Sequence, residues 1–289
     1  MKHPLHNAVL TPPISKLTNP NTSRSRQSSS LRVPKPKHLT ASSTMVSKIW
    51  NLIKDRFDLE KQVTFYLAYH HNKMNQLVHL VCIWPILITV LMLAADWTPA
   101  FFDMPASIAS GTIGRYMVFN LSAVGAIVYM VWYILLDPMC VFPSSIAGMN
   151  LWSDLRLMFD SAGTLGAFLV FWSYIFANYM AHTSPANLGV SSWVIALPIH
   201  IGGILISQIL GHVVYERRRP AIIETIDQAL ITAPLFELLD ILFLIGYRKE
   251  LYERCMIQAR IDMLAFHGKD EFERLFGANE LTALVDSDA

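Results

Sequence analysis

The chain has 289 residues, of which 53% are hydrophobic and only 16% are charged, and its mean hydropathy is +0.37. Soluble domains carry about 25% charged residues, so this composition points to lipid as the surrounding solvent. The formal net charge of +1 excludes nucleic-acid binding driven by overall charge. The three cysteines are far apart in the chain, which argues against a disulfide framework or a CxxC zinc site.

Residues 1–54 contain Lys and Arg amid Ser, Thr and Pro but no Asp or Glu, so they cannot bury a core and are predicted to be a disordered basic extension. Their composition resembles an organellar transit peptide. Met45 offers a second plausible start, however, and the segment fits a disordered cytosolic extension equally well. The rest of the chain divides into a predicted membrane-embedded domain, residues 55–254, and a polar C-terminal tail, residues 255–289.

Two charge-free stretches, one after Lys73 and one after Arg115, each have about the 20 residues that a helix needs to cross a bilayer. A third, from Ser161 to Tyr215, is too long for one span and is interrupted by the turn-like run HTSPANLGVSS, so it predicts two helices. Backbone polar groups must be paired within hydrocarbon. We therefore expect an all-α, polytopic membrane protein with about four transmembrane helices, two of them carrying internal prolines at Pro85 and Pro198.

After the fourth predicted span, residues 220–254 mix apolar stretches around Pro234 with Glu224, Asp227, Glu237 and Asp240. This pattern predicts amphipathic or re-entrant helices and disfavours a fifth span. Basic residues cluster before the first span and again just after the fourth, which places both termini in the cytosol of a multi-pass protein.

Histidines at the start of the first predicted span form one polar group, in the run YHHNKMNQLVH. On a helix, His71, Asn75 and His79 advance four residues at a time and share one face. His70 points elsewhere unless the helix begins after it, so helix geometry leaves the choice between His70 and His71 open.

A second polar group lies at the end of the fourth predicted span, where Gln208, His212 and Glu216 are also spaced by four and His200 lies about three turns earlier. If the first and fourth spans pack together, the two polar faces meet at one interface. Imidazole suits iron, zinc, copper and nickel, so the meeting point predicts a metal site whose metal the pattern does not decide.

A structural role is the alternative for each of these residues, because a lone histidine in a span more often hydrogen-bonds between helices than binds a metal. Asn75 and Gln208 fit that role as well. The set as a whole is harder to explain by packing, since Leu or Ala would pack there without burying polar groups. We therefore predict a functional site. Arg219 is the best candidate of the basic cluster to pair with a substrate carboxylate, although topology determination is the commoner role of such a cluster.

The same residues resemble the signatures of a small endoplasmic-reticulum membrane family, the iron-dependent 2-hydroxy fatty acid dioxygenases of fungal phytosphingosine breakdown. The first signature, Tyr-His-x-Asn-(Lys/Pro)-x-Asn-x-x-x-His, favours His70 over His71. The middle of the chain, from residue 137 to 163, looks longer than in the family, so substrate chain length could differ. The signatures match Tyr69, His70, Asn72, Lys73, Asn75 and His79, then Gln208, Gly211, His212, Glu216, Arg218, Pro220 and Ala221, and His200 also matches a family histidine.

The resemblance implies an Fe(2+)-dependent dioxygenase that uses O2 to shorten a 2-hydroxy long-chain fatty acid by one carbon, with membrane lipid as its surroundings. We expect residues 55–254 to be the catalytic domain, and His70, His79 and His212 to bind the metal with His200 as a fourth ligand. Glu216, Gln208 and Asn75 are expected to support catalysis, and Arg219 and Tyr69 to bind substrate. A triad of His79, His212 and Glu216 is an equally permitted ligand set.

Two other classes of function remain open at this point. One is a non-catalytic lipid-binding or scaffold protein whose histidines only hydrogen-bond across helices. The other is a transporter, which is disfavoured because the polar groups gather at one interface and not at the bilayer midplane. Sequence alone leaves the oligomeric state unknown.

Overall fold

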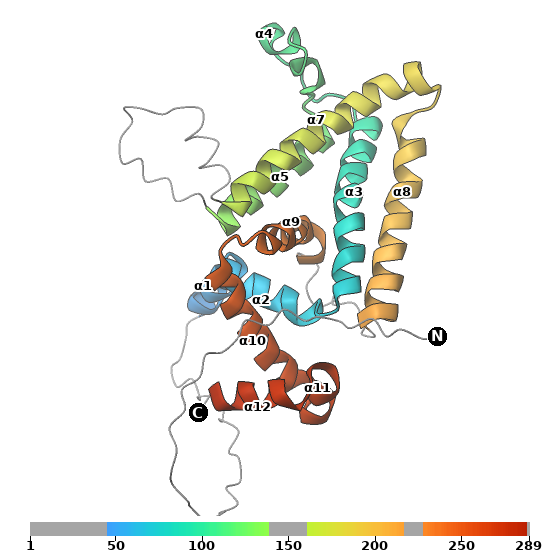
Figure 1. The fold of residues 1–289 in the computed structure, drawn as a ribbon. Coiled ribbons are helices and arrows are strands. Elements are labelled where there is room, and N and C mark those ends of the chain that lie inside the picture. Colours follow the sequence, from blue (N-terminus) through green and yellow to red (C-terminus); the bar gives the residue numbers. More distant parts are fainter. Residues whose placement is uncertain (1–44, 139–160, 217–227, 288–289) are drawn as a thin grey trace, which may run out of the picture. The chain divides into compact units, whose positions relative to one another are not determined.

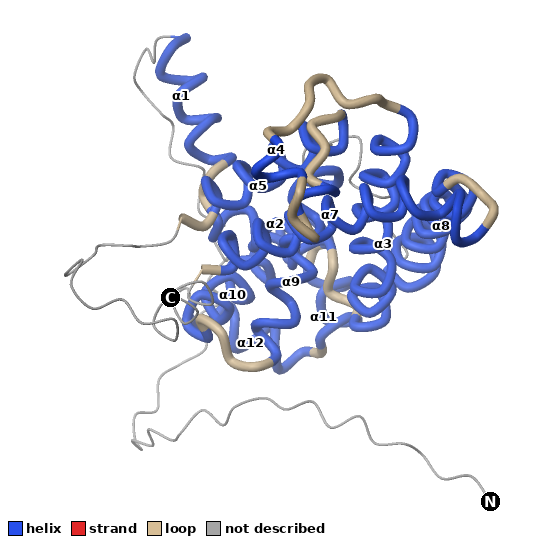
Figure 2. The backbone as a smooth tube through the Cα atoms, turned by 90° about the horizontal axis from the view of Figure 1, so that it is seen from above, coloured by secondary structure: helices blue, strands red, loops and turns tan. Residues whose placement is uncertain are grey.

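A computed structural model describes residues 45–138, 161–216 and 228–287. This part of the chain is helical and contains no strand, which confirms the all-α prediction (Figure 2). Its helices are α1 (Met45–Arg56), α2 (Leu59–Tyr69), α3 (Lys73–Trp97), α4 (Ala106–Ala109), η1 (Gly114–Tyr116), α5 (Leu121–Leu136), α7 (Ala162–Leu188), α8 (Ser192–Ile206), η2 (Ser207–Glu216), η4 (Gln228–Thr232), α9 (Ala233–Leu244), α10 (Lys249–His267), α11 (Lys269–Phe276) and α12 (Ala278–Ser287).

Three helices in the described residues are long and apolar enough to cross a membrane: α3, with 25 residues, α7, with 27, and the 25 residues of α8 and η2 together. The predicted second span is shorter than expected, because its helix, α5, has only 16 residues. A bent pair, Leu230–Leu244 and Lys249–Phe266, turns through 116° and brings the total to four if it counts as one span. This bent pair fits the expectation of amphipathic or re-entrant helices, and Pro234 lies in the first turn of α9.

The break between the third and fourth predicted spans is narrower than the sequence indicated. Helix α7 continues through Pro185 to Leu188, and the chain turns at Gly189, whose φ of +71° is a conformation that glycine adopts without strain. Helix α8 begins three residues later, at Ser192. Pro85 and Pro198 lie inside α3 and α8, as predicted.

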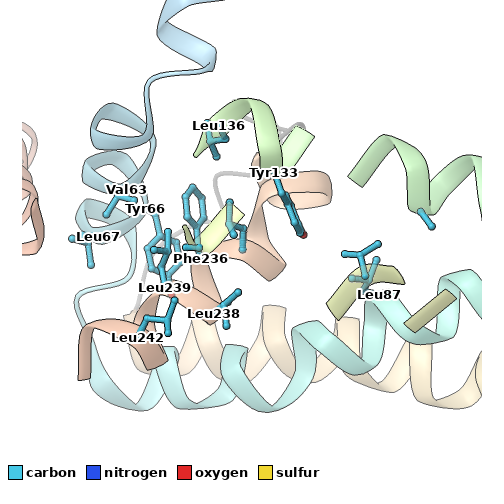
Figure 3. Close-up of a cluster of buried hydrophobic side chains, with 14 of the residues drawn as sticks. Val63, Tyr66, Leu67, Leu87, Tyr133, Leu136, Phe236, Leu238, Leu239 and Leu242 are labelled. Atoms are coloured by element: carbon cyan, nitrogen blue, oxygen red, sulfur yellow. The ribbon is translucent and has the colours of Figure 1, made fainter. Parts of the chain in front are cut away.

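Helix α3 is the central element, since it packs against α5, α7, α8, α9 and η2 (Figure 1). Helices α5 and α7 form a second close pair. The buried apolar cluster joins α2 to α9 and α5, with Tyr66 beside Phe236 and Leu239 (Figure 3). Burying each such side chain contributes about 1.5–3 kcal/mol, so this cluster fixes α2 and α9 relative to each other.

The division of the chain into three segments stays a prediction. Of the expected extension, residues 1–44 lie outside the described residues, and residues 45–54 belong to α1. The expected tail contains most of α10 together with α11 and α12. Some of its side chains are buried, among them Cys255, Met263 and Phe272.

Candidate metal centre

Three histidines meet where α2 ends and α3 begins, against the middle of η2. His70 follows the last residue of α2, His79 lies in the second turn of α3, and His212 lies in η2. One ring nitrogen from each lies within 4.8 Å of the others. The ring centroids are 4.9–5.0 Å apart, and the ring planes cross at 69° to 86°. The three imidazoles therefore surround one point.

A short break between two helices brings His70 to this point. The backbone N–H of His70 donates to the Tyr66 carbonyl oxygen and completes the last turn of α2. Asn72 then begins α3, because its side-chain oxygen accepts a hydrogen bond of 2.8 Å from the Met74 backbone N–H. The chain changes direction between these caps, so that His70 can face His79 although only nine residues separate them.

Two of the three rings have one nitrogen fixed by a backbone carbonyl. Nδ1 of His70 lies 3.0 Å from the Tyr66 carbonyl oxygen, and Nδ1 of His79 lies 3.1 Å from that of Asn75. A carbonyl oxygen only accepts, so each Nδ1 carries the hydrogen and each Nε2 keeps its lone pair. Histidine ligands of metals usually donate their other ring N–H in this way. The arrangement leaves Nε2 of both rings available to a metal.

The charge state of His70 agrees with that use. Burial, together with the neighbouring His79 and His212 rings, lowers the pKa of His70 well below its usual value. The ring is therefore neutral at physiological pH, and a neutral imidazole is the form that binds a metal.

Glu216 connects the end of η2 to the start of α3. One carboxylate oxygen, Oε1, accepts hydrogen bonds from the Asn72 backbone N–H at 2.9 Å and from Asn75 Nδ2 at 3.0 Å. The other, Oε2, lies 2.8 Å from His71 Nδ1, and the Glu216 side chain has no exposed surface. His71 is thus the partner of Glu216, while His70 faces the other imidazoles. These contacts fit a residue that orients the site better than a ligand of the triad with His79 and His212.

The segment that carries His212 is a π-helix of ten residues, a form that usually appears as a single turn and often at functional sites. Gly211, the residue before His212, allows this segment to approach α3. A Cβ atom there would clash with the Asn75 side-chain oxygen and would lie 2.7 Å from His79 Cε1. The sequence signature includes Gly211 but indicates no role for it, and no helical periodicity could have indicated the π-helix.

The remaining predicted site residues lie in different places. His200 is not part of the three-histidine group: its Nδ1 lies 3.2 Å from both the Thr89 hydroxyl and the Ile86 carbonyl oxygen of α3. Twelve residues along a helix correspond to about 18 Å, which separates His200 from His212. Gln208 has a buried Oε1 with no hydrogen-bond partner in the described part of the chain. Tyr69 stacks on Phe65, and Arg219 lies outside the described residues.

The donor set suits a first-row transition metal. Three neutral imidazoles from separate elements match the preference of iron, zinc, copper and nickel for nitrogen ligands. The Glu216 carboxylate accepts a hydrogen bond from Asn75, whose carbonyl oxygen contacts His79. The described residues thus define a class: a helical protein with three or four helices able to cross a membrane and with a three-histidine group able to bind a metal.

Comparison with known proteins identifies the family. A family model described as "2-hydroxy-palmitic acid dioxygenase Mpo1-like" matches residues 57–244, and the chain belongs to this family. The 2-hydroxy-palmitic acid dioxygenase MPO1 of Saccharomyces cerevisiae is 26% identical over 201 residues, which cover 67% of this chain and 85% of the yeast protein. No solved structure matches the chain. The resemblance found in the two signatures is confirmed.

Proposed function

We propose that the protein is an Fe(II)-dependent 2-hydroxy fatty acid dioxygenase of sphingoid-base and fatty acid catabolism. The observation that carries the proposal is the group of His70, His79 and His212, which lies within the segment that matches the family model. The name of the yeast relative supplies the class of substrate, a 2-hydroxy fatty acid, and O2 is the second substrate of a dioxygenase.

The proposed reaction balances with one molecule of O2. A 2-hydroxy acid and O2 yield a fatty acid one carbon shorter, CO2 and water: the bond between C1 and C2 breaks, and the four electrons released by the two carbons reduce O2. Iron, when bound by the three histidines, supplies the activation of O2 that organic side chains cannot provide.

The protein's own residues provide the geometry. The carbonyl groups of Tyr66 and Asn75 hold the rings of His70 and His79 so that both Nε2 atoms face inward. Glu216 fixes the start of α3 relative to η2 through Asn72 and Asn75. Holding the alpha carbon close to the oxidant is the main catalytic contribution that such a rigid frame makes. Tyr69 and Arg219 are proposed substrate contacts, and the acyl chain is proposed to lie along the apolar helices.

The location of the protein is part of the same proposal. The apolar helices support a membrane protein, and the family resemblance leads us to place it in the endoplasmic reticulum with both termini cytosolic. The rival function is a non-catalytic membrane scaffold, in which the three imidazoles only contact one another.

The experiment that separates these functions starts from full-length protein purified anaerobically in detergent. It is loaded with Fe(II), given O2 and 2-hydroxypalmitate, and analysed by mass spectrometry for the C15 acid. We expect product from the native protein and none from a His212→Ala variant. Purified protein that binds no stoichiometric metal and forms no product with several chain lengths would favour the scaffold.

A further inference from the structure

Tyr66 contacts the His70 ring in two independent ways. The backbone carbonyl of Tyr66 accepts the His70 Nδ1–H at 3.0 Å, and the two rings stack with centroids 4.4 Å apart and planes at 20°. The Tyr66 ring also stacks on Phe236 of α9, whose ring centroid lies 4.8 Å from that of Tyr66 (Figure 3). A shift of the Tyr66 ring would therefore move the His70 ring.

Two carboxyl groups of α9 hold the phenol end of Tyr66. Its hydroxyl lies 2.7 Å from Asp240 Oδ2 and 3.3 Å from Glu237 Oε1. Glu237 is completely buried, and its second oxygen, Oε2, has no partner among the described residues. A buried carboxyl group is costly, and Leu at this position of an apolar helix would pack without that cost. Its retention beside Tyr66 calls for a role.

The Tyr66 hydroxyl is the donor in this arrangement, because a carboxylate oxygen accepts hydrogen bonds. The shorter contact identifies Asp240 as the main acceptor.

We infer that Tyr66 is a positioning residue for the metal ligand His70, and that Asp240 and Glu237 fix Tyr66 from helix α9. The inference rests on the proposed function only for the role of His70 as a ligand. Through these contacts α9, which contributes none of the three histidines, helps to set the position of His70. Partners of metal-bound histidines typically change metal affinity or activity by 10–100-fold when they are removed.

Metal binding tests the inference with full-length protein in detergent, stripped of metal and titrated anaerobically with Co(II) as a spectroscopic probe. In Tyr66→Phe the ring stack remains and the hydroxyl contacts to α9 are lost. Because the carbonyl and stacking contacts with His70 are kept, we expect up to about 10-fold weaker Co(II) binding, the lower end of the range for lost partners of metal-bound histidines, with altered ligand-field bands. After loading with Fe(II), kcat should fall while KM for 2-hydroxypalmitate stays close to the native value.

Tyr129→Phe is the matched control. The Tyr129 hydroxyl donates to the Leu230 carbonyl oxygen at 2.7 Å, so this variant also removes a tyrosine hydrogen bond to the segment around α9. It should bind Co(II) like the native protein. Equal affinities and spectra for Tyr66→Phe and Tyr129→Phe would overturn the inference, and so would equal losses in both.

A second pair of variants decides the matter if Tyr66→Phe does not fold. Asp240→Asn keeps an oxygen that accepts from Tyr66 and should stay within about threefold of native affinity, whereas Asp240→Leu should lose as much as Tyr66→Phe. Equal affinity of the two Asp240 variants would contradict the inference. Native protein that binds Co(II) but does not turn over 2-hydroxypalmitate would instead count against the proposed function alone.

Discussion

The two halves of the helix from Ser192 to Glu216, α8 and η2, each contain a histidine, but the two histidines have different surroundings. In α8, only Ser192 and Ala196 are buried, and His200 hydrogen-bonds to α3. In η2, the buried residues are polar or small, and His212 meets two other histidines. Apolar side chains of α8 such as Ile201 and Leu205 are exposed, as expected of a surface that faces lipid.

A histidine between helices is therefore not enough to define the site. His200 and His212 both lie against α3, but Thr89 and Ile86 meet the first, whereas His79 and the end of α2 meet the second. A polar residue between helices becomes a candidate metal ligand only where several elements end together. The change from α-helix to π-helix occurs at the same place.

Replacing each of the two histidines separately by alanine should give the greatest difference in activity. His212→Ala should abolish bound iron and product formation, a loss beyond the 100-fold upper end for residues that only support a ligand. His200→Ala should retain iron and most activity, because Thr89 keeps its bonds to the Pro85 and Ile86 carbonyl oxygens. Metal analysis and product assays on both proteins check this. Loss of iron from His200→Ala would restore it as a ligand.

The next largest effect on metal binding is expected from replacing Glu216, whose hydrogen-bond network has no equivalent in α8. Glu216→Ala leaves the Asn72 and Asn75 donors without an acceptor, at about 1–3 kcal/mol for each buried group. Iron affinity should fall by about 10–100-fold. Glu216→Gln keeps one acceptor oxygen and should retain iron. Complete loss of iron in the glutamine variant, measured by metal titration, would favour the triad of His79, His212 and Glu216.

One glycine from each half, Gly211 and Gly202, gives a third contrast. A Cβ atom at Gly211 would clash with Asn75 and crowd His79, so Gly211→Ala should cost about 1–3 kcal/mol and weaken metal binding. A Cβ atom at Gly202 of α8 would meet nothing within 4 Å. Gly202→Ala should therefore be neutral or stabilising by up to about 1 kcal/mol. Thermal unfolding in detergent measures both, and equal shifts would show that close approach at η2 is unimportant.

The smallest effect is expected at Thr89, the partner of His200. Thr89→Val removes one hydroxyl from the contact between α3 and α8, which should lower stability by about 1 kcal/mol. Product formation should not change, because the histidine centre is not touched. A large loss of activity in an otherwise folded protein would show that α8 shares in the site after all.

Helix type and the approximate positions of the long apolar helices could be predicted from the sequence, because unpaired backbone groups in hydrocarbon leave few alternatives. Their ends could not be. Pro185 marked a turn in the sequence, yet α7 continues past it, since packing and the glycine that follows decide where the helix stops. Helix α5 has only 16 residues, because the length of a charge-free stretch is only an upper bound on the length of the helix within it.

Three of the four predicted histidine ligands meet as expected, and two features of the site could not be foreseen. Helical spacing put His71 on the face of His79, but the break before Asn72 turns His70 there instead and gives His71 to Glu216. The interval from His200 to His212 is about three helical turns, yet it says nothing about which partners each histidine meets. Such contacts depend on residues distant in the chain, which periodicity does not encode.

The hydrogen bond between Tyr66 and Asp240 joins residues 174 positions apart. A ribosome that adds about 5–20 residues per second needs about 9 to 35 s to synthesise that interval. For most of this time the nascent chain contains His70 and His79 but not His212, the third histidine of the group. The three histidines can therefore meet only late in synthesis, when part of the C-terminal third of the chain has been made.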